Sequence, residues 1–285
     1  MTKPAVIIST FLFATSIAIC TESKKLSLLD AKKEGLVTVN TTGVGGYTGQ
    51  CIIMEITVIG KKEIEIVIDA GLKLIPEDSA VQSMIVTQDK ILALAPKAVR
   101  KIKLYAMCTE SSDMSPPDGS TFAMGPMADG NLMEVVKFIS AKKYQADAAQ
   151  QAIWCITDSA SIGGIQDDAN PALAKELRMF VAKLTGKIPP WYQIEYKQET
   201  GTVFTNEPAV IKADFQYTLK EEGTVTFAIY NEKGEMVQTL VENHKEKPGL
   251  GTMKIRFETR EFKKGKYFVR VTNNGVLIEE KVFEL

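Results

Sequence analysis

Two blocks of short strand-like runs, separated by a stretch with helical spacing, constrain the fold of this chain more than any other feature. Runs such as CIIMEITVIG and KEIEIVIDAG make up the first block, and similar runs fill residues 205–285. They are rich in Ile and Val and are interrupted by Gly, Pro and Asp, as β-strands are. A length of 285 residues suggests about two domains. The pattern predicts a mainly β fold with a helical insert, in the α+β class.

Between the two blocks the apolar residues recur with the period of a helix. This spacing predicts helices near 131–140, 146–157 and 171–185, the last with Pro171 at its start and Gly186 after its end. A shorter helix is expected within 24–36. Residues 24–190 are therefore expected to form a β-sandwich or barrel-like domain with three helices.

The second block, 205–285, contains about seven short strand-like runs separated by turns such as NEKG and TNNG. Regular turns of this kind predict an immunoglobulin-like β-sandwich. Its last part carries Gly234 before a Val-rich run, KGKY at 264–267 and KVF at 281–283. These features resemble the C-terminal sorting domain of the bacterial type IX secretion system and the immunoglobulin-like module of hook-capping proteins. The resemblance implies export machinery as a partner, and an ordinary accessory β-sandwich is the alternative.

The N-terminus predicts export by a different signal. Lys3 is followed by an apolar run from Ala5 to Cys20, and a polar stretch follows at once. This pattern is typical of a cleaved signal peptide over residues 1–20, because the run is short for a membrane span. We expect a secreted or outer-cell-surface protein without an integral membrane span after cleavage. Lipoprotein anchoring through Cys20 is the less favoured alternative, because Ile19 is bulky where a small residue is expected.

Composition argues against several function classes. The net charge is −1 with both signs well mixed, so no nucleic-acid partner is expected. His244 is the only histidine, which disfavours a His-based metal site, a Cys–His pair and a Ser–His–Asp triad. Asp167, Asp168 and Asn170 lack a calcium-loop signature, and the glycine loop at 43–49 precedes a strand instead of a helix. No cofactor is expected, and an enzyme is the least favoured class.

Three cysteines remain after signal cleavage: Cys51, Cys108 and Cys155. In an oxidising compartment an odd number leaves at least one thiol unpaired. Three buried free thiols that pack as small apolar side chains are the alternative. Spacing does not determine a pairing.

The segment AAQQAIW at 148–154 is the most distinctive local motif. It resembles the Thr-Gln-x-Ala-Ile-Trp motif of the thioester domains of bacterial surface adhesins, in which a cysteine at a strand end precedes the motif. By that resemblance Gln150 takes the glutamine role, Cys108 the cysteine role, and Trp154 packs beside them on the same helix face. Ala149 stands where the family has threonine. A broader group of exported β-sandwich domains shares the Gln-x-Ala-Val/Ile-Trp helix, and no activity follows from that likeness.

A plain core helix explains the same residues. A buried glutamine must be hydrogen-bonded, and Gln151, about 100° around the helix from Gln150, is expected to be the ordinary hydrogen-bonding side chain. Cys155 is expected to be a core thiol. The sequence thus predicts a surface adhesion or ligand-binding protein for an unidentified glycan or protein, with a Cys108–Gln150 thioester or as a non-covalent module.

Overall fold

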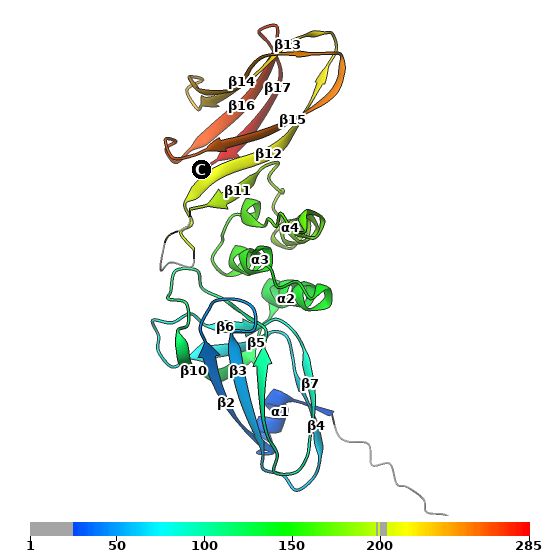
Figure 1. Ribbon diagram of the computed structural model, residues 1–285, viewed down its shortest axis with the longest axis vertical. Coiled ribbons are helices and arrows are strands. Elements are labelled where there is room, and N and C mark those ends of the chain that lie inside the picture. The colour runs from blue at the N-terminus through cyan, green and yellow to red at the C-terminus, as the bar shows by residue number, and fades with distance from the viewer. Residues whose placement is uncertain (1–24, 198, 200–203) are drawn as a thin grey trace, which may run out of the picture.

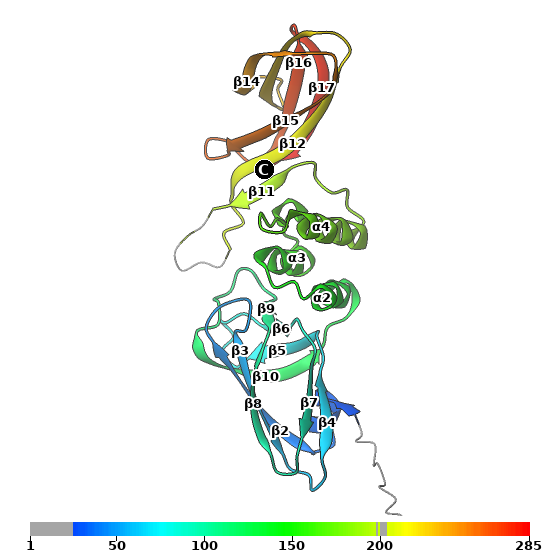
Figure 2. The same cartoon turned by 45° about the vertical axis from the view of Figure 1, so that its right-hand side comes forward.

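The computed structural model describes residues 25–197, 199 and 204–285. These residues are 47% strand and 19% helix, arranged in four sheets and a few helices. This content confirms the predicted mainly β fold with a helical insert. Figures 1 and 2 show helices α2, α3 and α4 as a layer between an N-terminal β region and a C-terminal one. The expected signal peptide and Cys20 lie outside the described residues.

The N-terminal β region consists of two sheets. A seven-stranded sheet has the order β8-β3-β2-β10-β5-β6-β9, and a three-stranded sheet has the order β1-β4-β7. Their strands are β1 (Lys25–Ser27), β2 (Val37–Val44), β3 (Ile52–Val58), β4 (Ile64–Ile68), β5 (Leu72–Pro76), β6 (Met84–Val86), β7 (Lys90–Leu94), β8 (Val99–Leu104), β9 (Ala106–Cys108) and β10 (Asp118–Met127).

Alternation of buried and half-buried residues shows how these strands pack. In β3 the side chains of Ile52, Met54, Ile56 and Val58 are buried, and the residues between them are not. Successive side chains of a strand point to opposite faces, so this period of two places one face of the sheet on the core. β3 pairs antiparallel with β2 and β8 along its length.

The first helix is shorter than the sequence indicates. Residues 25–27 form strand β1, and α1 covers only Leu28–Lys33. Leu26 is buried and pairs with Ile66 of β4 in a parallel ladder. Ser27 then begins the helix, because its side chain accepts a hydrogen bond from the Asp30 N–H. A neighbouring strand far along the chain therefore overrides the local helical pattern.

The helical layer consists of α2 (Gly130–Lys142), α3 (Asp147–Thr157), the 3-10 turn η1 (Ile162–Gly164) and α4 (Pro171–Thr185). For α4, Asn170 caps the start by accepting from the Leu173 N–H, and Gly186 closes it in the left-handed conformation. The buried apolar side chains of all four elements belong to one hydrophobic core with the N-terminal sheets. The helices are thus part of the N-terminal unit.

The C-terminal β region is a sandwich of two antiparallel sheets with a core of its own. One sheet has the order β11-β12-β15 and the other β14-β13-β16-β17. Their strands are β11 (Gln193–Tyr196), β12 (Pro208–Leu219), β13 (Gly223–Asn231), β14 (Met236–Glu246), β15 (Gly249–Glu258), β16 (Lys266–Asn273) and β17 (Val276–Glu284).

The sandwich begins earlier in the chain than Thr205, where the sequence places it. β11 pairs with β12, and Ile194 is buried in the C-terminal core. β11 also joins the sandwich to the helical layer, because the Ile194 carbonyl accepts a hydrogen bond of 2.8 Å from Gln166 Nε2. Lys212 of β12 adds an ion pair of 3.0 Å to Asp168.

Within residues 25–197, 199 and 204–285, no helix combines the length and the apolar character needed to cross a bilayer.

Candidate functional site

Helix α3 is buried on all sides over most of its length. Eight consecutive residues, Ala148–Cys155, are buried. The helix contacts β9 on one side and α2, α4 and η1 on others, and three of the eight residues are alanines, whose small side chains allow close approach. A helix in this position must satisfy its polar side chains within the protein.

Gln150 and Cys108 lie against each other, as the resemblance implies. The backbone N–H of Cys108 donates to Gln150 Oε1 at 3.0 Å, and Gln150 Nε2 donates to the Cys108 carbonyl at 2.8 Å. β9 is the last strand of its sheet, and the same N–H also donates to the Tyr47 carbonyl at 3.0 Å. The carboxamide of Gln150 therefore pairs with the outer edge of β9, beside the loop that contains Tyr47, much as another strand residue would.

The thiol of Cys108 points into the core. Its Sγ lies 3.3 Å from Sδ of Met84, the residue opposite it on β6. Burial raises the pKa of the Cys108 thiol well above its ordinary value. The thiol is therefore protonated at neutral pH, and a thiolate nucleophile is a minor species.

The other two thiols are also buried and unpaired. Burial raises the pKa of Cys51 to about 11 and that of Cys155 to about 12. Cys155 contacts the Ser161 carbonyl at 3.5 Å, and Cys51 contacts the Ala106 carbonyl at 3.5 Å. These thiols match the alternative of three buried free thiols that the sequence left open.

The structure differs from the prediction for Gln151. The sequence predicts that Gln151 is the ordinary hydrogen-bonding glutamine, but that role belongs to Gln150. Nε2 of Gln151 is buried and has no hydrogen-bond partner among the described residues, and the side chain as a whole is 5% exposed. Gly164 makes room for it, because a Cβ there would come within 2.8 Å of Gln151 Nε2.

Trp154 lies on the same side of α3 as Gln151, three residues further along. Its ring stacks on Tyr47 at a centroid distance of 6.3 Å and packs on Phe204 at 5.0 Å. The side chain is 4% exposed, and its Nε1–H has no partner in the part of the chain that the structure describes. The predicted proximity of Trp154 to Gln150 is present, since both line one cavity.

This cavity, which we call the α3 cavity, has a volume of about 310 Å³ and lies between the helical layer and β11. Its lining residues are Tyr47, Asp147, Gln150, Gln151, Trp154, Gly164, Gln166, Tyr196 and Phe204. Of the four lining residues on α3, the sequence indicated Gln150, Gln151 and Trp154. It gave no signal for Gln166, Tyr196 or Phe204. Those three come from segments that only the folded chain brings together.

The tyrosines of the α3 cavity are held neutral. The Tyr47 hydroxyl donates to Asp147 at 3.5 Å. Burial is the main cause that raises the pKa of Tyr47, and the Asp147 carboxylate raises it further. Burial also raises the pKa of Tyr196, whose hydroxyl lies near Ser161. Both hydroxyls therefore stay protonated over the neutral and mildly alkaline range.

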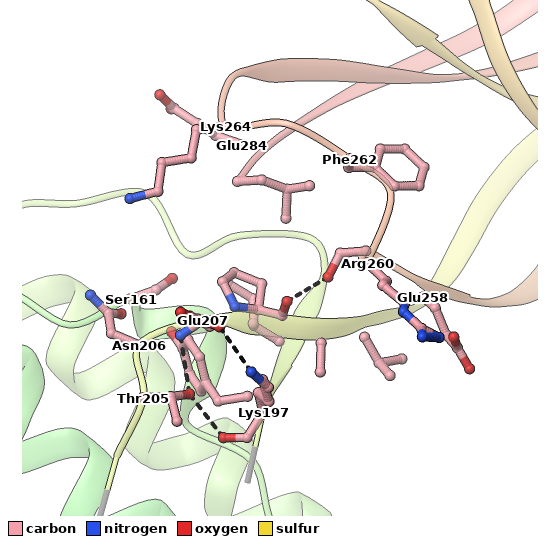
Figure 3. A pocket seen from close by; sticks show the side chains of 17 residues that line it. Ser161, Lys197, Thr205, Asn206, Glu207, Glu258, Arg260, Phe262, Lys264 and Glu284 are labelled. Carbon is pink, nitrogen blue, oxygen red and sulfur yellow. Dashed lines mark hydrogen bonds and ion pairs between the residues drawn. The ribbon is translucent and has the colours of Figure 1, made fainter. Parts of the chain in front are cut away.

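A larger groove of about 1170 Å³ lies between the helical layer and the C-terminal sandwich (Figure 3). Both charge signs line it: Lys197, Arg260 and Lys264 against Glu207, Glu258 and Glu284. Lys197 pairs with Glu207 at 3.6 Å, a contact drawn in Figure 3. The groove shares Tyr196 with the α3 cavity, but its mixed charges favour no single class of ion.

The acidic residues and the histidine weighed from the sequence are engaged in structural contacts. Asp167 accepts from the Tyr144 hydroxyl at 2.8 Å and from the backbone of Asn170 at 3.2 Å. His244 lies on β14, with Nε2 3.0 Å from Glu246. The described residues contain no cluster of three or more His, Cys, Asp or Glu side chains that could hold a metal ion.

Comparison with known proteins does not identify a family for this chain. No family model matches the chain, and no curated protein is significantly similar to it. A solved structure of CBM51-2 and INT domains of ZmpB from Clostridium perfringens, in complex with GlcNAc, is 10% identical, with a TM-score of 0.19; the match covers 88% of this chain and 93% of that one. A solved structure of a β-glucosidase from Kluyveromyces marxianus is 11% identical, with a TM-score of 0.20. That match covers 82% of this chain and 44% of the other. At such TM-scores neither likeness carries an argument about function.

Proposed function

We propose that this protein is an exported ligand-binding module of the adhesion type, in which Cys108 and Gln150 form an internal thioester. One observation supports it: residues 42 positions apart meet, with the Gln150 carboxamide held on the Cys108 backbone by hydrogen bonds of 3.0 and 2.8 Å. Both residues are fully buried. Their pairing follows the motif resemblance, which alone assigns them a chemical role.

The proposed reaction needs no oxidant and no cofactor. The Cys108 sulfur attacks Cδ of Gln150, and the Cδ–Nε2 bond breaks. The thiol proton leaves with the nitrogen, so one ammonia is released for each thioester formed. An amine on a ligand can then attack the same carbon, which forms an amide bond and returns the thiol.

The surroundings of the pair set the expected rate and lifetime. Exclusion of water protects a thioester from hydrolysis; both partners are buried, and the buried Trp154 lines the same cavity as Gln150. The raised pKa of Cys108 makes the thiolate scarce at neutral pH. Thioester formation should therefore be slow near pH 7 and accelerate as pH rises.

A non-covalent ligand-binding module is the second candidate. The observation that favours it is that the Gln150 carboxamide already has a backbone partner at each end, while the Cys108 sulfur contacts Met84. In this case Gln150 is a structural residue that pairs with the edge of β9. We assign no catalytic turnover to the protein in either case.

Intact mass spectrometry of the purified protein tests the thioester. We expect a mass lower than the sequence mass by one ammonia, and a methylamine adduct after incubation with methylamine. Cys108→Ala should abolish both changes, whereas Cys155→Ala, which removes a buried thiol outside the pair, should preserve them. An unchanged mass with all three thiols titratable after unfolding would contradict the thioester and leave the non-covalent candidate.

Export and attachment form a separate part of the proposal. They are supported by the sequence pattern of residues 1–20 and by the resemblance of the last strands to sorting domains. A truncated variant whose last residue is Lys187 lacks the whole sandwich. The missing part includes β11 and Trp191, whose Nε1 donates to the Val282 carbonyl. In the native host this deletion should abolish surface labelling while the protein remains detectable in cells; unchanged labelling would contradict a sorting role.

A further inference from the structure

Four residues that line the α3 cavity carry a buried polar atom that lacks a hydrogen-bond partner among the described residues. These atoms are Nε2 of Gln151, Nε1 of Trp154, Oε1 of Gln166 and the hydroxyl of Tyr196. A buried polar group without a partner costs about 1–3 kcal/mol, and such groups are few in folded proteins. Four of them around one cavity indicate that the cavity is built to receive polar groups from outside the chain.

The polar character of these atoms follows from the residues that carry them. Gln166 Nε2 donates to the Ile194 carbonyl at 2.8 Å, so Oε1 of the same amide is the acceptor left for the cavity. The indole N–H of Trp154 can only donate, Nε2 of Gln151 also donates, and the Tyr196 hydroxyl can do both. The cavity thus offers two neutral donors, one neutral acceptor and one hydroxyl.

The walls around these atoms are aromatic. Trp154 packs between Tyr47 and Phe204, and Phe204 also packs edge-on against Tyr196 at 4.7 Å. A few convergent polar groups within an apolar wall are typical of small-molecule sites, whose volumes begin at roughly 300 Å³. The volume of about 310 Å³ therefore fits a compact ligand.

The polar pattern selects the chemical class of that ligand. A hydroxyl group both donates and accepts, so neighbouring hydroxyls can serve Gln151, Trp154 and Gln166 together. An ammonium ion would leave the two donors unpaired. Among the described lining residues Asp147 is the group charged at neutral pH, and it disfavours an anion.

We infer that the α3 cavity binds a neutral polyhydroxylated ligand of monosaccharide size, such as the terminal sugar of a glycan, with its hydroxyls on Gln151, Trp154 and Gln166. Aromatic rings would cover the apolar C–H faces of the sugar. This inference rests on the proposed ligand-binding function and names its ligand class, but it does not require the thioester.

The two tryptophans of the chain allow a direct test. Trp191 lies away from the α3 cavity, with Nε1 bonded to the Val282 carbonyl. Trp191→Phe leaves Trp154 as the only indole, so its emission reports on the cavity. We would titrate this variant with glucose, galactose, mannose, fucose and N-acetylglucosamine, and expect at least one sugar to change the emission saturably and to raise Tm.

Further variants in the Trp191→Phe background test the named contacts. Gln151→Leu and Gln166→Leu should each weaken binding of that sugar about tenfold, since each removes one hydrogen bond. Gly164→Ala should block binding by pushing Gln151 into the cavity. Gln145→Leu is the matched control, because Gln145 also has a buried unpartnered Nε2 but does not line the cavity; its affinity should be unchanged.

Three results would overturn the inference: no sugar changes the emission or Tm of the folded variant, as for a cavity that holds water alone; Gln151→Leu and Gln166→Leu bind normally; or Gln145→Leu weakens binding equally. Cys108→Ala separates this inference from the thioester. Sugar binding should survive that substitution, while any methylamine adduct should disappear with it.

Discussion

The two sides of α3 differ in how they satisfy the hydrogen-bonding groups of two neighbouring glutamines. On the side toward β9, both ends of the Gln150 carboxamide bond to the Cys108 backbone. On the side toward the α3 cavity, Nε2 of Gln151 and Nε1 of Trp154 have no partner among the described residues. Exposure does not separate the two sides, because all three side chains are almost fully buried.

Burial alone therefore does not assign a role to a polar residue. A buried amide with both partners in place stabilises the fold, and each such bond contributes about 1 kcal/mol net. A buried amide without a partner costs stability and is retained where function requires it. Gln150 belongs to the first case unless it reacts with Cys108, and Gln151 belongs to the second.

Among single substitutions, the largest effect is expected at Gln150. Gln150→Leu should lower the free energy of unfolding by about 2–3 kcal/mol, because the buried Cys108 carbonyl loses its donor and the carboxamide bonds disappear. The Cys108 N–H keeps the Tyr47 carbonyl, which limits the loss. Urea unfolding followed by circular dichroism measures it. A loss below about 0.5 kcal/mol, the usual range for surface substitutions, would contradict a structural role.

Alkaline pH tests the thiols around both sides of α3. Unfolded thiols ionise near pH 8.5, whereas Cys51 and Cys155 have pKa values of about 11 and about 12 in the folded chain. Above pH 8.5 the unfolded chain therefore binds fewer protons, and the free energy of unfolding falls by up to about 1.4 kcal/mol per pH unit for each thiol. The loss for Cys51 ends as pH passes about 11.

Urea unfolding between pH 8 and 10.5 measures this slope, and Cys108→Ala is the comparison. A free Cys108 adds to the slope of the wild type, because burial raises its pKa as well. A Cys108 held in a thioester has no proton to lose, so the variant and the wild type would then have equal slopes. A stability that rises over this pH range would contradict the burial of the thiols.

The smallest effect is expected at Gln151. Gln151→Leu should change the free energy of unfolding by less than about 1 kcal/mol and can stabilise the protein, because an unpartnered buried amide is replaced by an apolar side chain of similar length. The same urea experiment beside Gln150→Leu measures it. A loss as large as that of Gln150→Leu would show that the two sides of α3 do not differ.

Much of the fold could be predicted from local pattern. The period-two runs indicate a mainly β chain, and the Pro171 and Gly186 signals coincide with the ends of α4. Local pattern failed where a distant segment intervenes: residues 25–27 become a strand because Leu26 pairs with Ile66. β11 lies ahead of Thr205, because Ile194 completes the C-terminal core.

The sequence alone predicts the strand and helix classes, and the resemblance of one motif indicates the pair Cys108 and Gln150. Chemistry along a helix face can be read from spacing, since residues three and four apart lie on one face. That Gln150 has hydrogen-bond partners and Nε2 of Gln151 has none among the described residues follows from tertiary packing. The partners of Gln150 belong to Cys108 of β9, and Gly164 of η1 leaves the space that Gln151 occupies. The positions of these segments depend on how the whole chain packs. The α3 cavity is a product of that packing, and no local pattern contains it.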